Sequence, residues 1–173
     1  MRNFHITVAP SAYLAMTGVF VLFTVGGLVM FGDILQGVIF GIGVVLIHAL
    51  HELLHNIGHY IASRRVGYPM RGMRFWGVLA SSIYPKDEGV LPPRVHIQRA
   101  AGGPIFSAFI TLLYVVMFVI TQAQGGVGML LLFGILDGLL VFTIGALMPV
   151  NMLTRLPIET DGDTILRYLS RSL

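Results

Sequence analysis

Two histidines four residues apart, His51 and His55, enclose a glutamate, Glu52, within an apolar stretch of the chain. Residues four apart lie on one face of a helix, so both imidazoles can bind one Zn²⁺ ion. The glutamate then lies beside the metal, where it can take a proton from a water molecule that zinc activates. This spacing predicts hydrolytic chemistry, with His51 and His55 as metal ligands and Glu52 as the general base.

The same helix face carries further histidines, which leaves a second ligand pair open. Four histidines fall within an arc of roughly 80° at 100° per residue: His48, His51, His55 and His59. About 12 Å of helix rise separates His51 from His59, so one zinc with bonds of ~2.0–2.1 Å cannot bind both. The pair is therefore His51/His55 or His55/His59.

We favour His51/His55, because in the other pair Asn56 occupies the base position and cannot act as a base. His59 is then a neighbour of the site on its substrate side, and His48 lies further out. The same composition also fits a hydrogen-bonded structural cluster, but four histidines and a glutamate in one apolar helix favour a functional site.

A carboxylate completes the expected ligand set, because a catalytic zinc site has three protein ligands and one open position. Asp161 precedes Gly162 in the polar segment after the last apolar stretch, at the same membrane end as the histidines. Asp137 lies inside an apolar stretch, where we expect it to form a hydrogen bond between helices. The predicted metal ligands are therefore His51, His55 and Asp161.

Composition is typical of an integral membrane protein. Of the 173 residues, 55% are hydrophobic and 11% are charged, with a mean hydropathy of +0.83, whereas soluble domains carry about 25% charged residues. Four stretches are long enough to span a bilayer, which takes about 20 residues: 12–32, 34–62, 100–122 and 126–148. We expect an all-α membrane fold of four transmembrane helices, forming one domain over residues 1–173 with its motifs within 34–166.

A small β-hairpin is expected between the second and third spans, at the membrane surface. Residues 73–84 are rich in aromatic and aliphatic side chains and are followed by a Pro-Lys-Asp-Glu-Gly turn. A strand with an unpaired edge there could pair with an extended peptide.

The basic residues predict the orientation of the chain. All eleven lysines and arginines lie in three places: Arg2, 64–99 and 155–171. The positive-inside rule therefore puts both termini and the long middle loop in the cytoplasm, as expected for a multi-pass protein of the cell membrane. The pI near 9.6 then reflects topology and contact with anionic lipid headgroups, not nucleic-acid binding. The absence of cysteine excludes disulfides and thiolate metal sites.

Several motifs in one order resemble the site-2 protease family of intramembrane zinc metalloproteases. The matching pieces are His51-Glu52-Leu53-Leu54-His55, the 73–84 hairpin, Gly103-Pro104, and Asn151, Pro157 and Asp161-Gly162. The resemblance implies one zinc ion per chain and cleavage of peptide bonds in or near transmembrane segments. Such substrates must unwind locally, since a helix keeps its carbonyls in its own hydrogen bonds. A regulatory membrane partner is a further expectation.

Three departures from the family pattern support an alternative function. The family's motif tail, His-x-x-x-Ala-Arg-Arg-x-Gly, fits 59–67 with Ser63 at the alanine position, which favours the His55/His59 pair. Ser107 stands where the family commonly has asparagine, and the spacing from Asn151 to Asp161 is longer than usual. The alternative is an inactive homologue that binds metal or a membrane partner without hydrolysis. Metal transport is a weaker third reading, because the polar groups gather at one end of the span.

Overall fold

Four long helices form the body of the protein. A computed structural model describes residues 4–171 of the chain, so Arg2, counted above for orientation, lies outside the described residues. The helices are α1 (Pro10–Phe31), α2 (Ile34–Arg65), α3 (Pro93–Thr121) and α4 (Gly125–Leu136), which continues as the π-helical segment η1 (Asp137–Gly145). Each of the four, α4 taken together with η1, is long and apolar enough to cross a membrane. The four predicted spans therefore exist as helices.

The boundaries of two spans differ from the prediction. Helix α3 begins at Pro93, well before the predicted residue 100, because the Pro92-Pro93 pair sets the first helical turn. Pro104, expected at a helix start, thus lies inside α3. The fourth helix changes at Asp137 from α-helical to π-helical hydrogen bonding, a change that marks functional sites in many proteins. Apolar composition does not distinguish the two kinds of helix.

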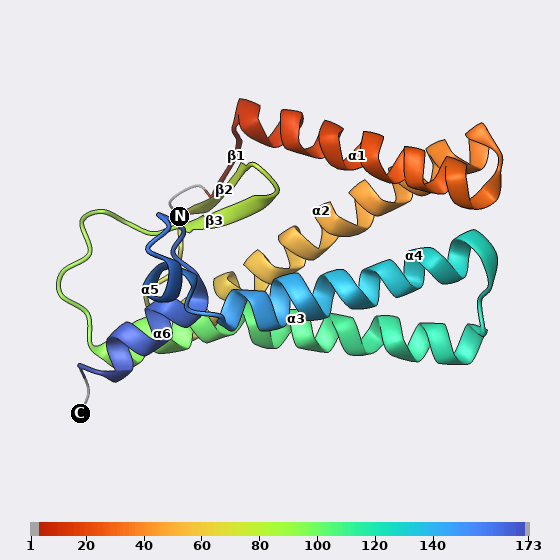
Figure 1. The fold of residues 1–173 in the computed structure, drawn as a ribbon. Coiled ribbons are helices and arrows are strands. Elements are labelled where there is room, and N and C mark those ends of the chain that lie inside the picture. Colours follow the sequence, from red (N-terminus) through yellow and green to blue (C-terminus); the bar gives the residue numbers. More distant parts are fainter. Residues whose placement is uncertain (1–3, 172–173) are drawn as a thin grey trace.

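Short connections lie at one end of the bundle and the polar elements at the other. The turn between α1 and α2 uses Gly32 in the left-handed region (φ 66°), and Asp33 then caps α2 by accepting from the Gln36 N–H at 2.8 Å. The connection between α3 and α4 lies at the same end (Figure 1). The described ends of the chain, the sheet and the two C-terminal helices all gather at the opposite end.

A three-stranded sheet lies beside the polar end of α2. Its order is β1 (His5–Val8), β2 (Gly72–Trp76) and β3 (Leu79–Ile83), with β1 parallel and β3 antiparallel to β2. The expected hairpin is formed by β2 and β3, and its position at a membrane surface stays a prediction. Strand β1 was not predicted, because its four residues precede α1 and find their partner only after the first two helices.

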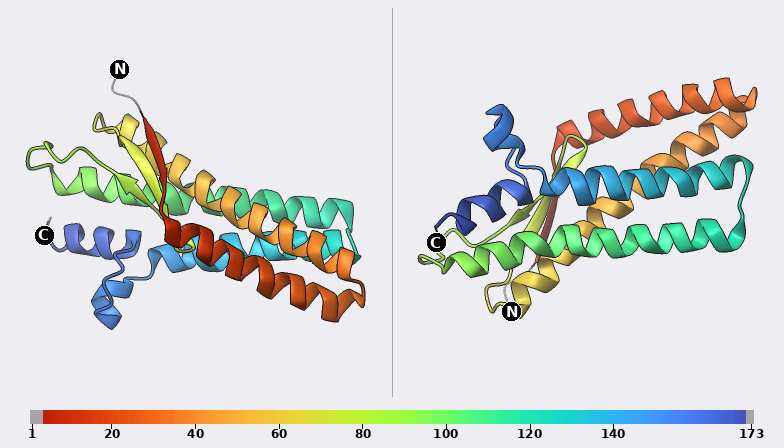
Figure 2. Two further views of the ribbon diagram at one scale, coloured as in Figure 1. Left: turned by 90° about the horizontal axis from the view of Figure 1, so that it is seen from above. Right: turned by 60° about the horizontal axis from the view of Figure 1, so that its bottom comes forward.

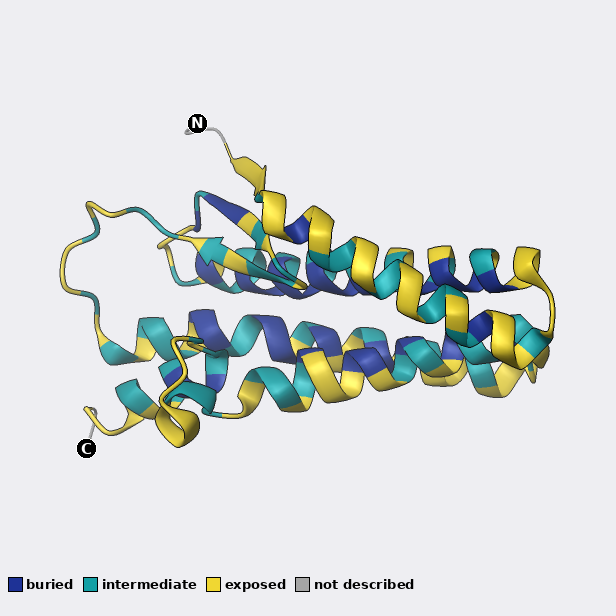
Figure 3. Ribbon diagram, turned by 45° about the horizontal axis from the view of Figure 1, so that its top comes forward, coloured by how far each residue is buried: buried dark blue, intermediate teal, exposed yellow. Residues whose placement is uncertain are grey.

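Helix α2 is the centre of the packing. It contacts α1, α3, α4, η1 and β3, and its buried residues gather toward its polar end. Figure 3 shows buried residues along the facing sides of α2 and α3, while α1 is largely exposed. Gly58 and Gly102 allow this close approach, because a Cβ on either would clash with the backbone of the other.

Two short helices complete the polar end, α5 (Val150–Thr154) and α6 (Asp161–Leu169). Helix α6 packs on the first part of α3 (Figure 2). A capping box between Thr160 and Asp163 sets the start of α6, so that Asp161 is its first residue and faces α2.

Candidate metal site

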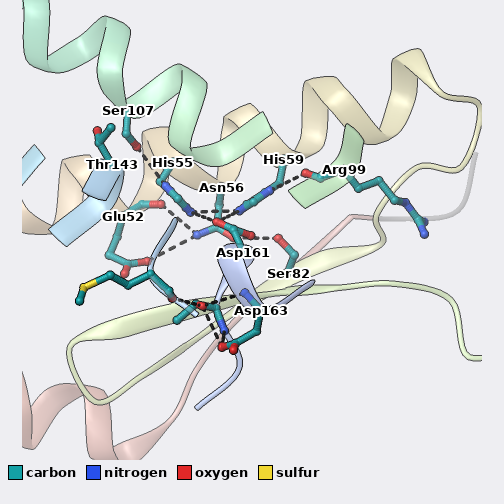
Figure 4. A network of polar contacts seen from close by, with 12 residues as sticks. Glu52, His55, Asn56, His59, Ser82, Arg99, Ser107, Thr143, Asp161 and Asp163 are labelled. Atoms are coloured by element: carbon teal, nitrogen blue, oxygen red, sulfur yellow. Dashed lines mark hydrogen bonds and ion pairs between the residues drawn. The ribbon is translucent and has the colours of Figure 1, made fainter. Parts of the chain in front are cut away.

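Three potential ligands converge at the polar end of α2, and we call them the convergent group: His55, His59 and Asp161 (Figure 4). The Nε2 atoms of the two histidines are 3.0 Å apart. The Asp161 Oδ2 atom lies 3.2 Å from His55 Nε2 and 3.4 Å from His59 Nε2. Both histidines are buried, and the aspartate is half-buried.

The remaining nitrogen of each ring is bound elsewhere, which decides what the ring presents to the site. His59 Nδ1 donates to the Arg99 carbonyl oxygen at 2.8 Å, so in the neutral ring Nε2 carries a lone pair. His55 Nδ1 lies 3.0 Å from the Ser107 hydroxyl. Partners of this kind orient metal-binding histidines. The Arg99 carbonyl can only accept, so it selects the tautomer of His59 with a free Nε2, whereas the Ser107 hydroxyl fixes the direction of the His55 ring and not its tautomer.

The donor set fits a zinc ion. Tetrahedral zinc with bonds of ~2.0–2.2 Å places its ligand atoms about 3.3–3.5 Å apart, close to the observed 3.0, 3.2 and 3.4 Å. Burial acts to raise the pKa of Asp161, but His59 and His55 more than offset it and hold that pKa below its usual range. The third ligand is thus a carboxylate, and two histidines with one carboxylate form a catalytic zinc set.

Glycine 103 lets α3 pass directly behind these ligands. A Cβ at Gly103 would clash with the Nε2 atoms of both His55 and His59. Gly103 therefore lies against the imidazoles themselves, and a larger residue there would displace them.

Asp163 holds the loop that carries Asp161, and sequence reasoning missed it. Its carboxylate is buried and accepts four hydrogen bonds, of 2.9–3.0 Å, from the backbone N–H groups of Asn151, Met152 and Thr160 and the Thr160 hydroxyl. Burial raises its pKa, but these donors lower it further, to below the usual value. A Thr-x-x-Asp pattern over 160–163 is the capping-box signal that could have identified it.

A second set, the hydrogen-bonded group, lies deeper on α2: His48, His51 and Asp137. His51 Nδ1 is 2.9 Å from Asp137 Oδ2, and His48 Nδ1 is 3.0 Å from Asp137 Oδ1. His48 Nε2 donates to the Val78 carbonyl oxygen in the hairpin turn at 2.7 Å. Asp137 thus makes the hydrogen bonds between helices that the sequence predicted.

The structure therefore separates the ligands that the sequence grouped. His51 was expected with His55 and Asp161, but its ring is bound to Asp137, and its Nε2 atom has no hydrogen-bond partner within residues 4–171. The reason is depth, since four residues of helix correspond to about 6 Å, and Asp137 of η1 lies at that level. His59 takes the place expected for His51, and His48, expected as an outer neighbour of the site, is bound to Asp137 together with His51.

Asn56 follows the first histidine of the convergent group and contacts Glu52 one turn earlier. Its amide nitrogen donates to the Glu52 backbone oxygen at 3.0 Å and approaches Glu52 Oε2 at 3.5 Å. The Ser82 hydroxyl of β3 donates to the Asn56 side-chain oxygen at 3.1 Å. Glu52 is 3% exposed, so a buried carboxylate lies next to the convergent group (Figure 4).

A cavity of about 720 Å³ opens onto these groups. It is lined by the convergent group, Glu52, the residues of β3 and part of η1. Arg99 braces one wall: its guanidinium pairs with the Glu88 carboxylate at 2.6 and 2.9 Å and lies 3.9 Å from the Tyr84 ring. Burial raises the pKa of Tyr84 to about 12, so this wall ring stays neutral. Neither Arg99 nor Tyr84 was predicted, because both act through contacts distant in sequence.

Comparison with known proteins supports the resemblance at the level of fold. No family model matches the chain, and no curated protein matches its sequence. Among solved structures it is similar to a site-2 protease from Methanocaldococcus jannaschii, with a TM-score of 0.57 and 17% identity over 99% of this chain and 69% of that one. The chain is thus a membrane protein with the fold of a site-2 protease.

Proposed function

We propose that this protein is an intramembrane zinc metalloendopeptidase with His55, His59 and Asp161 as metal ligands and Glu52 as general base. The observation that carries the proposal is the convergence of three ligand atoms in a cavity shared with a buried carboxylate. The fold likeness to a site-2 protease supports the same function. His59 replaces His51 in the ligand set, because the His51 ring is bound to Asp137.

Different residues of the chain carry out different parts of peptide hydrolysis. Zinc, when bound, would polarise the substrate carbonyl and lower the pKa of a water molecule. Glu52 takes a proton from the water molecule as the water oxygen attacks the carbonyl carbon. It then delivers that proton to the amine nitrogen as the C–N bond breaks. Ser107 and the Arg99 carbonyl hold the two imidazoles in place through their Nδ1 atoms.

Strand β3 offers a way to present the substrate. It is the last strand of the sheet, and its residues 79–82 line the cavity. An extended peptide can add to such an edge through backbone hydrogen bonds. We expect the substrates to be transmembrane segments of other proteins, unwound where they enter the cavity because a helix keeps its carbonyls bonded.

The orientation follows from the basic residues. The site lies at the end of the bundle where the described ends of the chain and most of the arginines gather (Figure 1), which the positive-inside rule assigns to the cytoplasm. Single cysteines in place of Lys86, Arg171 and Gln124 test this in intact cells. An impermeant reagent should label only the third from outside, and equal labelling of all three contradicts the topology.

Hydrolysis is tested with the purified full-length protein, loaded with zinc in detergent and given dye-quenched casein as an unfolded probe. Chelation should abolish cleavage, and zinc should restore it. Glu52→Gln should keep one zinc per chain but lose roughly 10²–10⁴-fold in kcat, as expected for removal of a general base. Wild-type turnover in the zinc-loaded Glu52→Gln protein would refute the mechanism.

A non-hydrolytic metal-binding protein is the second candidate, and one observation favours it. Position 56, next to the first ligand, holds an amide where a zinc peptidase motif has its base. One bound zinc per chain without chelator-sensitive cleavage of casein, or of a labelled transmembrane peptide in liposomes, would decide for this candidate.

A further inference from the structure

The direction of the Asn56 amide is determined by its neighbours. On the Glu52 side it meets two acceptors, a backbone oxygen at 3.0 Å and a carboxylate oxygen at 3.5 Å. On the other side the Ser82 hydroxyl lies at 3.1 Å and can donate. A flipped amide would face its oxygen toward both acceptors, so the nitrogen must point to Glu52.

The amide nitrogen of Asn56 thus contacts two acceptors of one residue, Glu52. Asn56 is 1% exposed and Glu52 is 3% exposed, so both side chains are shielded from bulk solvent. Since residues four apart share a helix face, the amide holds the Glu52 carboxylate at the wall of the cavity beside the convergent group. The long 3.5 Å contact lets the carboxylate leave the amide when it meets water or substrate.

Ser82 extends the contact to the sheet. It lies in β3, opposite Met73 of β2, and its hydroxyl is the donor to Asn56. The neighbouring Ser81 is bound differently, because its hydroxyl accepts from the Trp76 indole at 2.6 Å. A hydrogen-bonded path therefore runs from β3 through Asn56 to Glu52.

We propose that Asn56 is a positioning residue, which clamps the general base Glu52 one helical turn away from the usual base position and links it to strand β3 through Ser82. The inference rests on the proposed function. It explains why an amide occupies position 56: a second carboxylate there would lie beside Glu52 in a buried site, where two like charges oppose ionisation. An amide instead adds no charge and offers a hydrogen-bond donor to the Glu52 carboxylate.

Infrared spectroscopy tests the clamp without any need for activity. The chain has three glutamates, Glu52, Glu88 and Glu159, so labelling with carboxyl-¹³C glutamate gives few bands, and the Glu52 band is the one that Glu52→Gln removes. Asn56→Ala should shift this band, Ser82→Ala should shift it less, and Ser81→Ala should leave it in place. An unchanged band in Asn56→Ala overturns the clamp.

Kinetics on casein test whether the clamp serves catalysis. Asn56→Ala should lower kcat about 10- to 100-fold, the cost typical of a misplaced catalytic group, with unchanged KM and one zinc per chain. Loss of zinc, or a change in KM alone, would show a merely structural role and overturn the proposal. If the wild type cleaves casein but the Glu52 band is unshifted in Asn56→Ala, the clamp is refuted and the proposed function stands. If the band shifts but the wild type shows no cleavage, the proposed function is refuted and the clamp stands.

Discussion

Helix α2 contributes two histidines to each of two groups, and an aspartate from another element completes each group, Asp137 of η1 and Asp161 of α6. The histidines of the two groups turn opposite ring nitrogens toward their aspartate. In the hydrogen-bonded group both Nδ1 atoms face the carboxylate of Asp137: His51 Nδ1 contacts one oxygen, and His48 Nδ1 contacts both, at 3.0 and 3.2 Å. In the convergent group both Nε2 atoms face one oxygen of Asp161 and each other. Residue types and spacing are nearly the same in the two groups, so they do not explain the difference.

The ring direction decides which group can bind a metal. A carboxylate between two Nδ1 atoms is satisfied by protons, and its two oxygens keep the rings apart. Where three lone pairs point at one place, a cation is needed to hold them together. The hydrogen bonds on the far side of each ring therefore set the ring direction: the Val78 carbonyl for His48, and Ser107 and the Arg99 carbonyl for the convergent group.

The largest expected difference between the two groups is in zinc content. His59→Ala should bring the purified protein from one zinc per chain to nearly none, because it removes one of three ligands. His51→Ala should keep nearly one, because that ring is bound to Asp137. Elemental analysis after dialysis measures both. The reverse pattern, with zinc lost only in His51→Ala, would restore the ligand pair favoured by the sequence.

For the hydrogen-bonded group, the expected effect is on stability and not on zinc content. Asp137→Asn replaces a buried carboxylate that bonds two histidines, and should lower the free energy of unfolding by about 3 kcal/mol while zinc content stays the same. Denaturant titration in micelles measures it. Asp33→Asn is the matched control, since asparagine also caps a helix well and the exposed Asp33 bonds only the Gln36 N–H among described contacts. Equal effects in both variants would contradict a special role for Asp137.

Ser107 provides a smaller test on the convergent group. Ser107→Ala removes the partner of His55 Nδ1 and should weaken zinc binding 10- to 100-fold, the range typical of groups that orient metal ligands. Competition with a fluorescent chelator measures the affinity. Thr111→Ala is the control, because its hydroxyl lies one turn further along α3 and donates to the Ser107 backbone oxygen, not to the His55 ring. Unchanged affinity in Ser107→Ala would mean that His55 is held by packing alone.

The smallest expected effect is on stability and concerns the loop that carries Asp161. Asp163→Asn removes a charged acceptor of four hydrogen bonds and should cost about 1–2 kcal/mol of stability at pH 7. Because the folded pKa of Asp163 is below its usual value, its contribution is present above the unfolded pKa of about 3.9 and is lost as the pH falls through the folded pKa. The difference between wild type and variant should thus stay constant from pH 8 to 5 and shrink under stronger acid. A difference that grows on acidification would contradict this assignment.

Much of the fold could be predicted, because a helix that can span a bilayer is recognisable from its apolar composition. The four helices, the hairpin and the helix contact of Asp137 followed from apolar stretches, turn residues and the cost of a buried acid. Strand β1 and the π-helical form of η1 could not be predicted. The first depends on a partner beyond two helices, and the second on hydrogen bonds that apolar residues make equally well in either helix.

The sequence predicted which residues form the candidate site better than it predicted how they are arranged. His55 and Asp161 lie in the convergent group, as the motif suggested, but the second histidine differs. The sequence prediction chose His51 because Glu52 follows it at the base position. In the structure, contacts with Ser107, Arg99 and Asp137, which lie on other helices, set the direction of the histidine rings. The family's motif tail over 59–67 was the local signal for the arrangement that the structure has.

The pairing of β1 with β2 also constrains how the chain crosses the bilayer. Strand β1 precedes α1 and β2 follows α2, and their residues are paired from His5 with Gly72 to Val8 with Phe75. Two strands joined by backbone hydrogen bonds must lie on one side of the membrane, so the chain between them makes an even number of crossings. This parity holds whatever the distribution of charge, and β1 can pair only after β2, which follows both helices, has been synthesised.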